Sequence, residues 1–267
     1  MSKIFYTSYN KMYAEELRAI RNLCRYEYEE FEFDYPAYEV ETYDENKIKI
    51  IIDFIGSFYF KHKKLHSEDD KPAVEYDNGS MRWYKYGKLH REDDKPAIVD
   101  NEGGKEWWYG GRRHREDDKP AVTCYQGEEW WIYGARHRED DKPAIITDST
   151  EEWWVGGFMH RENKPAVIRH FIHDWEQENP MFVKEAWYLN GELHRLDGPA
   201  ITLQNEIREY YIYGKYMDEH TFNKVTKYIM KFANNMKKRY RARVCNSVYN
   251  NTTICYDVCK MISNYVL

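Results

Sequence analysis

The sequence has no long apolar run and few cysteines, and each shortage excludes a class of protein. None of its 267 residues lie in an apolar stretch approaching the roughly 20 residues that a membrane-spanning helix needs, so we expect no transmembrane segment. The opening residues lack a cationic start followed by an apolar stretch, so we expect no secretory signal. The cysteines are odd in number and scattered, which indicates a reduced intracellular chain. They are Cys24, Cys124, Cys245, Cys255 and Cys259.

Motifs that carry catalysis are also missing. The chain has no glycine-rich phosphate loop, no HExxH zinc helix and no nucleophile elbow. Its glycine pairs, such as Gly110 and Gly111, fall at turn positions. We therefore predict no catalytic residue, no cofactor and no enzymatic activity. An enzyme with a site on an aromatic face is the least favoured hypothesis.

An excess of positive over negative charge occurs at only one end of the chain. Residues 1–60 hold 7 Lys and Arg against 12 Asp and Glu, whereas residues 215–267 hold 10 against 3. The overall charge of −6 therefore conceals an acidic body and a basic tail. A nucleic-acid-binding domain carries its positive charge along the main surface, so we expect no nucleic-acid partner for the body. Binding of acidic lipid or nucleic acid by the tail alone stays open.

An internal repeat determines the architecture. One copy reads EWWIYGARHREDDKPAIIT, and the motif histidines recur at spacings of 24, 24, 23, 23 and 34 residues. In each copy, proline, alanine and a β-branched residue predict the start of a first strand. The polar segment that follows predicts a chain reversal, after which a second, aromatic strand begins and ends at a glycine. Each copy is thus a β-hairpin followed by a charged loop. The motif histidines are His66, His90, His114, His137, His160 and His194.

Two adjacent aromatic columns run through the copies. Neighbouring strand residues point to opposite faces, so both faces of the predicted sheet carry aromatic rings and both are at least partly covered. The first column is Tyr59, Trp83, Trp107, Trp130, Trp153, Trp187 and Tyr210. The second column is Phe60, Tyr84, Trp108, Trp131, Trp154, Tyr188 and Tyr211. We expect the tryptophans among them to form the repeat core.

The spacing of Trp154, Gly157 and His160 resembles the MORN repeat, a β-hairpin unit. The likeness covers about residues 58–217, but histidine is followed here by Arg-Glu-Asp-Asp-Lys-Pro where MORN units continue His-Gly-x-Gly. The variant WYxxGxxHRxDxPA is similar to MORN-like proteins of large DNA viruses of protists, such as Marseillevirus. The resemblance implies a mainly β fold, an elongated single-sheet meander of hairpin repeats. It also implies a viral structural or virus–host interaction protein, in the virion or the host cytoplasm.

The charged loops place histidines beside carboxylates, a combination that can bind metal. We favour a ladder in which arginines and acids of adjacent loops pair, because calcium-binding β-solenoid loops need glycine-rich turns. In the tail, Cys255 and Cys259 share a helix face, but with only Cys245 nearby they do not complete a zinc site. We therefore predict no metal site.

One copy carries an insertion at about residues 169–182. Insertions in repeat proteins map to loops on one face, often the binding face. One hypothesis is a protruding hairpin that docks a partner through Phe171, Trp175 and Phe182; the other is an insertion that the fold merely tolerates. Deleting the insertion should leave folding intact and abolish capture of a partner.

Helical segments flank the repeats. Apolar residues at steps of three and four predict helices over 9–28 and 222–243, the second strongly basic. A second, short helix near residue 260 is predicted to follow it. The apolar stripe of the basic helix is predicted to contain Phe222, Val225, Ile229, Phe232, Met236 and Tyr240. We divide the chain into an N-terminal cap over 1–57, repeats over 58–217 and a basic helical cap over 218–267. The basic helix either covers the open sheet edge or lies on an anionic membrane. We predict a non-enzymatic scaffold for protein partners, such as capsid or host proteins or a second copy, with peripheral membrane binding as the alternative.

Overall fold

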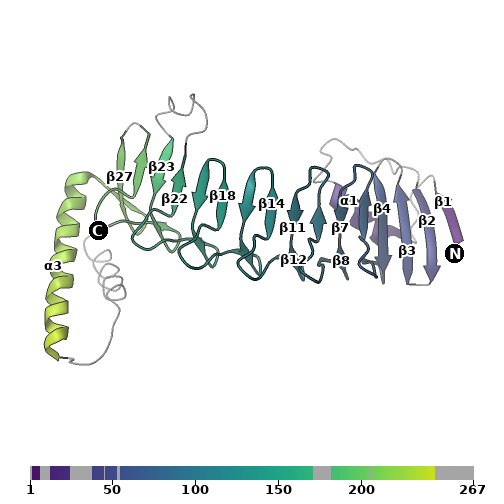
Figure 1. Ribbon diagram of the computed structural model, residues 1–267, viewed down its shortest axis with the longest axis horizontal. Coiled ribbons are helices and arrows are strands. Elements are labelled where there is room, and N and C mark those ends of the chain that lie inside the picture. Colours follow the sequence, from purple (N-terminus) through teal and green to yellow (C-terminus); the bar gives the residue numbers. More distant parts are fainter. Residues whose placement is uncertain are drawn as a thin grey trace. The chain divides into compact units, whose positions relative to one another are not determined.

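The computed structural model describes residues 2–6, 13–24, 38–44, 46–52, 55–170, 182–204 and 206–243 (Figure 1). Contacts divide the chain into two compact units, Met1–Ala135 and Arg136–Leu267. Antiparallel strands in consecutive order make up most of both units, which confirms the predicted mainly β meander of hairpins. No helix among the described residues is long and apolar enough to cross a bilayer.

The first unit begins with a helix and long strands and continues into shorter repeated strands. Its elements are β1 (Ser2–Tyr6), α1 (Ala14–Cys24), β2 (Tyr38–Asp44), β3 (Lys47–Ile52), β4 (Gly56–Lys61), β5 (Lys64–Leu65), β6 (Val74–Tyr76), β7 (Met81–Arg82), β8 (Tyr84–Lys85), β9 (Lys88–Leu89), β10 (Ile98–Val99), β11 (Lys105–Glu106), β12 (Trp108–Tyr109), β13 (Arg112–Arg113), β14 (Val122–Cys124), β15 (Gly127–Glu129) and β16 (Trp131–Ile132). β17 (Ala135–Arg136) contains the division between the units.

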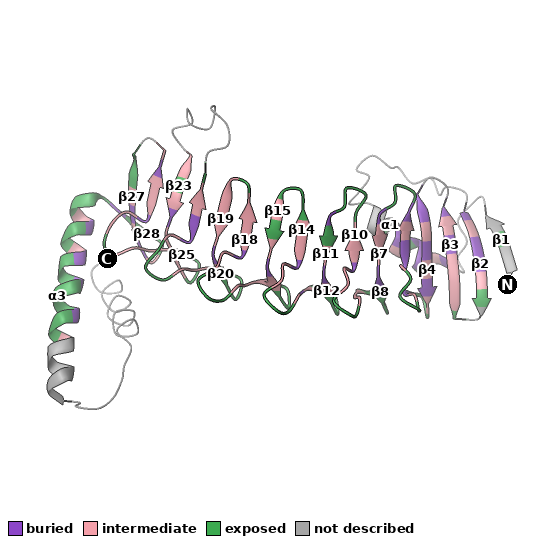
Figure 2. Ribbon diagram, viewed as in Figure 1, coloured by how far each residue is buried: buried purple, intermediate pink, exposed green. Residues whose placement is uncertain are grey.

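Helix α1 covers one face of the long strands. Leu17 and Ile20 of the helix share a core with Ile50 of β3 and Phe58 of β4. Burial alternates along β4 (Figure 2). Phe58 and Phe60 belong to this core, so the half-buried Tyr59 between them faces the opposite side of the sheet. The predicted N-terminal helix is therefore confirmed over Ala14–Cys24, where it caps the first repeats.

Each repeat contains two hairpins rather than one. The first hairpin belongs to the main sheet, as β10 pairs with β11, and β11 then pairs with β14 of the next repeat. The second hairpin, such as β12 with β13, has two-residue strands and forms a small separate sheet. Trp107 lies between β11 and β12, so the aromatic strand predicted to begin at this residue is interrupted there. The separation into two hairpins was not predicted.

The second unit repeats this arrangement and ends in a helix. Its elements are β18 (Ile145–Thr147), β19 (Thr150–Glu152), β20 (Trp154–Val155), β21 (Phe158–Met159), β22 (Val167–Arg169), β23 (Val183–Ala186), β24 (Tyr188–Leu189), β25 (Glu192–Leu193), β26 (Ile201–Leu203), β27 (Arg208–Ile212), β28 (Lys215–Met217) and α3 (Glu219–Arg243).

Helix α3 packs against the last strands of the second unit. Phe222 and Ile229 share a core with Tyr210 and Ile212 of β27. The buried face continues at Ala233, whereas Phe232, which the periodicity placed in the apolar stripe, is 43% exposed. The stripe prediction is wrong at Phe232 because the helix turns Ala233 inward. The predicted C-terminal cap is thus present, and the expected second helix near residue 260 lies outside the described residues.

The alanine after each repeat proline is fully buried. All six, Ala73, Ala97, Ala121, Ala144, Ala166 and Ala200, have 0% exposure. The carbonyl of Ala121 accepts a hydrogen bond from Trp107 N at 2.8 Å, so the column tryptophan lies directly beside it. A larger side chain would have to displace this packing.

We predict that Ala121→Val destabilises the protein by about 1–3 kcal/mol, because added methyl groups have no free space in a packed core. Urea unfolding of the full chain measures the change. Ala135→Val, at a half-buried strand position, is the matched control and should change stability by less than about 0.5 kcal/mol. Equal effects of the two substitutions would contradict this packing argument.

Candidate functional site

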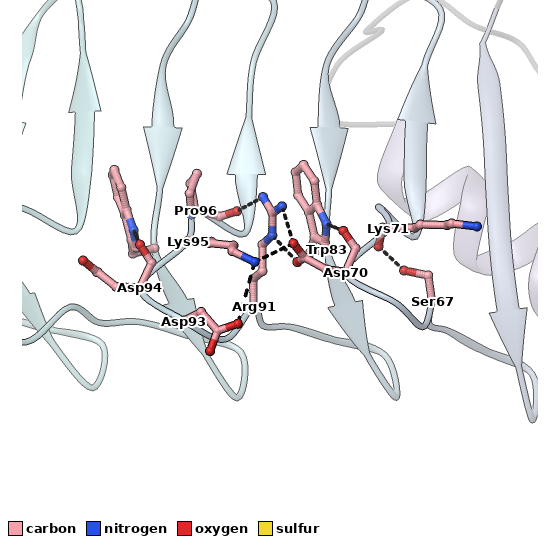
Figure 3. Close-up of polar contacts among 10 residues, drawn as sticks. Ser67, Asp70, Lys71, Trp83, Arg91, Asp93, Asp94, Lys95 and Pro96 are labelled. Carbon is pink, nitrogen blue, oxygen red and sulfur yellow. Dashed lines mark hydrogen bonds and ion pairs between the residues drawn. The ribbon is translucent and has the colours of Figure 1, made fainter.

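Arginine, tryptophan and aspartate of neighbouring repeats form a recurring cluster, which we call the arginine rung. In the first complete rung, the Arg91 guanidinium carbon lies 3.7 Å from the centre of the Trp83 ring. Arg91 donates to both carboxylate oxygens of Asp70, in the preceding loop, at 2.7 and 3.1 Å, and to the carbonyl of Pro96 at 3.1 Å (Figure 3). Lys95 Nζ donates to the same carboxylate at 2.8 Å. The Trp83 indole nitrogen donates to the Asp70 carbonyl at 3.0 Å.

The rung recurs along both units. Arginine lies 3.6 to 3.8 Å from the tryptophan centre in the pairs Arg115–Trp107, Arg161–Trp153 and Arg195–Trp187. The first-column residues Trp83, Trp107, Trp130 and Trp153 are buried, each 5–8% exposed, whereas Trp187 is half buried. The expected first-column core and the ladder of arginines and acids in adjacent loops are both present.

The local sequence explains why aspartate occupies the rung. In the loop of the second rung, Asp93 and Asp94 have φ of +59° and +52°, and Lys95 N closes the turn on the Glu92 carbonyl at 3.2 Å. Aspartate tolerates this left-handed conformation better than most residues, and it also supplies the carboxylate. Hydrogen bonding from Arg115, then Lys119, lowers the pKa of Asp94 to about 2. The repeated Asp-Asp thus serves both the turn and the ion pair.

The ladder changes where the loop shortens. The segment His160–Pro165 has one residue fewer than the other Arg-Glu-Asp-Asp-Lys loops and carries Asn163 in place of an aspartate. Arg195 of the next copy pairs instead with Asp197 of its own loop, at 2.7 Å. The indole nitrogen of Trp187 is buried and has no hydrogen-bond partner among the described residues. This weakened rung coincides with the copy that carries the insertion.

We predict that Arg115→Lys destabilises the protein by about 1–2 kcal/mol, because lysine keeps the charge but loses ring stacking and the two-pronged carboxylate contact. Urea unfolding provides the measurement. The matched control is Arg112→Lys, at an exposed position of the same repeat, for which we expect no change. A loss of stability in Arg112→Lys alone, or an equal loss in both variants, would show that the rung adds nothing to the stability of the protein.

The motif histidines act as hydrogen-bond acceptors. His114 Nδ1 accepts from Tyr133 N at 3.4 Å, and the His194 ring accepts in the same way from Tyr213 N at 3.2 Å. The equivalent contact recurs at His66, His90, His137 and His160. A ring nitrogen that accepts a hydrogen bond carries no proton of its own. Burial lowers the pKa of His194 to about 4 and is the main cause that lowers the pKa of His66.

We predict that stability falls by roughly 2 kcal/mol as the pH drops from 7 to 4.5, because the His194 pKa of about 4 lies below the value of 6.5 in the unfolded chain. The contribution of neutral His194 to folding stability is complete above pH 6.5 and is lost as the pH falls toward 4. Urea midpoints across this range measure the loss, and NMR titration locates the His194 midpoint. A midpoint near 6.5 would contradict the assignment.

A row of half-exposed tyrosines runs along the small hairpins of the first unit. These residues, the aromatic row, are Tyr86 (49% exposed), Tyr109 (56%) and Tyr133 (51%). Tyr86 and Tyr133 have φ of +51° and +46°, a conformation that costs a bulky residue energy. Their rings stack on His66 and His114 with centroids 4.5 and 3.9 Å apart. This row was not predicted from the sequence, although each of its tyrosines precedes a glycine shortly after the aromatic columns.

The second-column tryptophans are half buried and hydrogen-bonded. Trp108 Nε1 donates to Glu106 at 2.8 Å, and Arg113 donates to the same glutamate at 2.9 Å. Trp131 and Trp154 repeat the contact with Glu129 and Glu152. The predicted aromatic ladder on the second face therefore exists, with polar side chains covering part of each ring.

The predicted docking residues of the insertion fall largely outside the described residues. Phe171 and Trp175 lie there, whereas Phe182 is half buried and its carbonyl accepts from Gln204 N at 2.9 Å. β22 and β23 on either side pair directly, with Val167 opposite Ala186. The insertion thus leaves the flanking hairpin intact, and its role in docking stays a prediction.

No group of three or more His, Cys, Asp or Glu side chains among the described residues is arranged to hold a metal ion. The carboxylates of the loops that form complete rungs are instead engaged by arginine and lysine, as at Asp141, where Arg161 and then Lys164 lower the pKa to about 2. Comparison with protein-family models, with curated proteins and with solved structures finds no match.

Proposed function

We propose that this protein is a non-enzymatic repeat scaffold that binds a protein partner through the aromatic row of its first unit. The exposure of the row is the observation that carries the proposal. The repeated charged groups pair within the ladder and the histidines accept backbone hydrogen bonds, whereas Tyr86, Tyr109 and Tyr133 present about half of their surface to solvent. Tyrosine is enriched in protein interfaces, because its large ring loses little conformational entropy on binding.

The proposal includes a viral setting, with a capsid protein, a host protein or a second copy as the partner. Its support is the resemblance of the repeat to MORN-like proteins of large DNA viruses. Affinity purification from the native cell or particle, followed by mass spectrometry, identifies partners for direct titration.

We predict that the triple variant Tyr86→Asn, Tyr109→Thr, Tyr133→Asn binds the identified partner at least tenfold more weakly and stays folded. Asparagine suits the turn, because Asn190 occupies the same turn position with φ +52°. Titration of the purified partner measures the loss. Tyr125→Asn, at a tyrosine that is 77% exposed outside the row, is the control and should bind as the wild type does. Unchanged binding by the triple variant would overturn the proposal.

Peripheral membrane binding is the second candidate, favoured by one surface of α3. Tyr228 is 62% exposed and Phe232 43% exposed, and the exposed Lys224 and Lys231 lie at helical spacing around them. Exposed aromatic and basic side chains on one helix suit an anionic lipid surface. Flotation with phosphatidylserine vesicles separates the candidates. Lipid binding that disappears in Lys224→Gln, Lys231→Gln and on removal of 215–267 supports the membrane candidate, and no flotation opposes it.

A further inference from the structure

The first repeat lacks the arginine of the rung. Ser67 stands where Arg91 and Arg115 stand in later copies, and Tyr59 replaces the column tryptophan. The backbone is nevertheless the same: Tyr59 N donates to the Ala73 carbonyl at 2.8 Å, as Trp83 N does to that of Ala97. The first repeat is therefore built like the others around a position that its own sequence does not fill.

The ring and the carbonyl that hold arginine elsewhere are present at this position, as is the lysine that binds the aspartate of a complete rung, whereas the arginine and that aspartate are both missing. The three groups present are the Tyr59 ring, the Pro72 carbonyl and the Lys71 ammonium, the counterparts of Trp83, Pro96 and Lys95. Among the described residues, no guanidinium lies on Tyr59, no donor reaches the Pro72 carbonyl and no carboxylate contacts Lys71, whose carbonyl accepts a hydrogen bond from the Ser67 hydroxyl. The Nζ atom of Lys49 lies over the Tyr59 ring, 5.2 Å from its centre, which is farther than the 3.6 to 3.8 Å of the rung arginines.

An open hollow of about 370 Å³ occupies this position. Tyr59, Ser67, Lys71 and Pro72 line it. Figure 3 shows the Lys71 side chain pointing away from the Arg91 rung, whereas Lys95 reaches the Asp70 carboxylate. Glu68 also lines the hollow, and it is held by Lys47 at 2.7 Å and by Lys61 at 2.5 Å, so two lysines already engage its carboxylate.

The sixth copy shows that one short segment can supply both missing groups. Arg195 stacks on Trp187 at 3.8 Å, donates to the Pro199 carbonyl at 3.3 Å and pairs with Asp197 two residues on. An Arg-x-Asp segment therefore carries a guanidinium for a ring and a carboxylate close to it.

We propose that the hollow is a docking socket for an Arg-x-Asp segment of a partner protein. The guanidinium stacks on Tyr59 and donates to the Pro72 carbonyl, and the aspartate meets Lys71. The socket is distinct from the aromatic row and uses none of its tyrosines. Failure of the socket proposal would therefore leave the proposed function untouched, and the reverse is also true.

Fluorescence anisotropy of a labelled Gly-Arg-Leu-Asp-Gly peptide with the full chain tests the socket. Ser67→Arg fills the position from within, as arginine does in later copies, and should weaken peptide binding at least tenfold. Ser67→Ala is the matched control and should bind within twofold of the wild type. Tyr59→Leu, which removes the ring, should also weaken binding at least tenfold and serves if Ser67→Arg does not fold.

Changes in the peptide test each contact separately. Replacing its arginine by lysine should weaken binding at least tenfold, because lysine cannot stack and donate in the same way. Lys71→Met should weaken binding of the aspartate peptide but not of an asparagine analogue. No saturable binding by the wild type would overturn the proposal. The proposal would also be overturned if the Ser67→Arg and Tyr59→Leu variants bound the peptide as tightly as the wild type does, or if the wild type bound the lysine peptide as tightly as the arginine peptide.

Discussion

The stacking of arginine on tryptophan, tied to an aspartate of the preceding loop, is the interaction on which the repeats depend. The main-sheet strands of the middle repeats, such as β10 and β11, contain only two residues each, so few ladder hydrogen bonds join one repeat to the next. The rung adds side-chain contacts across the same boundary: Arg91 covers Trp83 and binds Asp70, and Trp83 also bonds the Asp70 backbone. Each rung thus both buries an indole and fixes the spacing between loops.

This use of side chains also shapes what the surface can do. The arginines, lysines and aspartates of the complete rungs pair with one another along the ladder, and the motif histidines accept backbone hydrogen bonds. The exposed tyrosine rings of the small hairpins and the open hollow of the first repeat are therefore the surfaces that we propose bind partner proteins. The hollow is a place where a copy departs from the repeat pattern, because serine occupies the arginine position.

Repetition made the architecture predictable from the sequence. The hairpins, the buried first column and the helices α1 and α3 follow from Pro-Ala-Val strands, aromatic pairs and helical periodicity. The interruption at Trp107 did not follow, because a residue between two hairpins and a residue opening a strand have the same neighbours in sequence. Exposure of the aromatic row depends on the direction of each small hairpin. The socket exists because Ser67 replaces the rung arginine. The sequence shows this replacement, but only the structure of the other rungs shows which contacts the arginine would make there.

A double-mutant cycle on Asp94 and Arg115 tests the central claim most directly. These residues belong to successive loops, and their side chains pair at 2.7 Å. Unfolding free energies of Asp94→Ala, Arg115→Ala and the double variant give the coupling between neighbouring repeats. The account predicts a favourable coupling of about 1 kcal/mol or more. Additive effects, within about 0.3 kcal/mol, would show that the repeats stack without the rung.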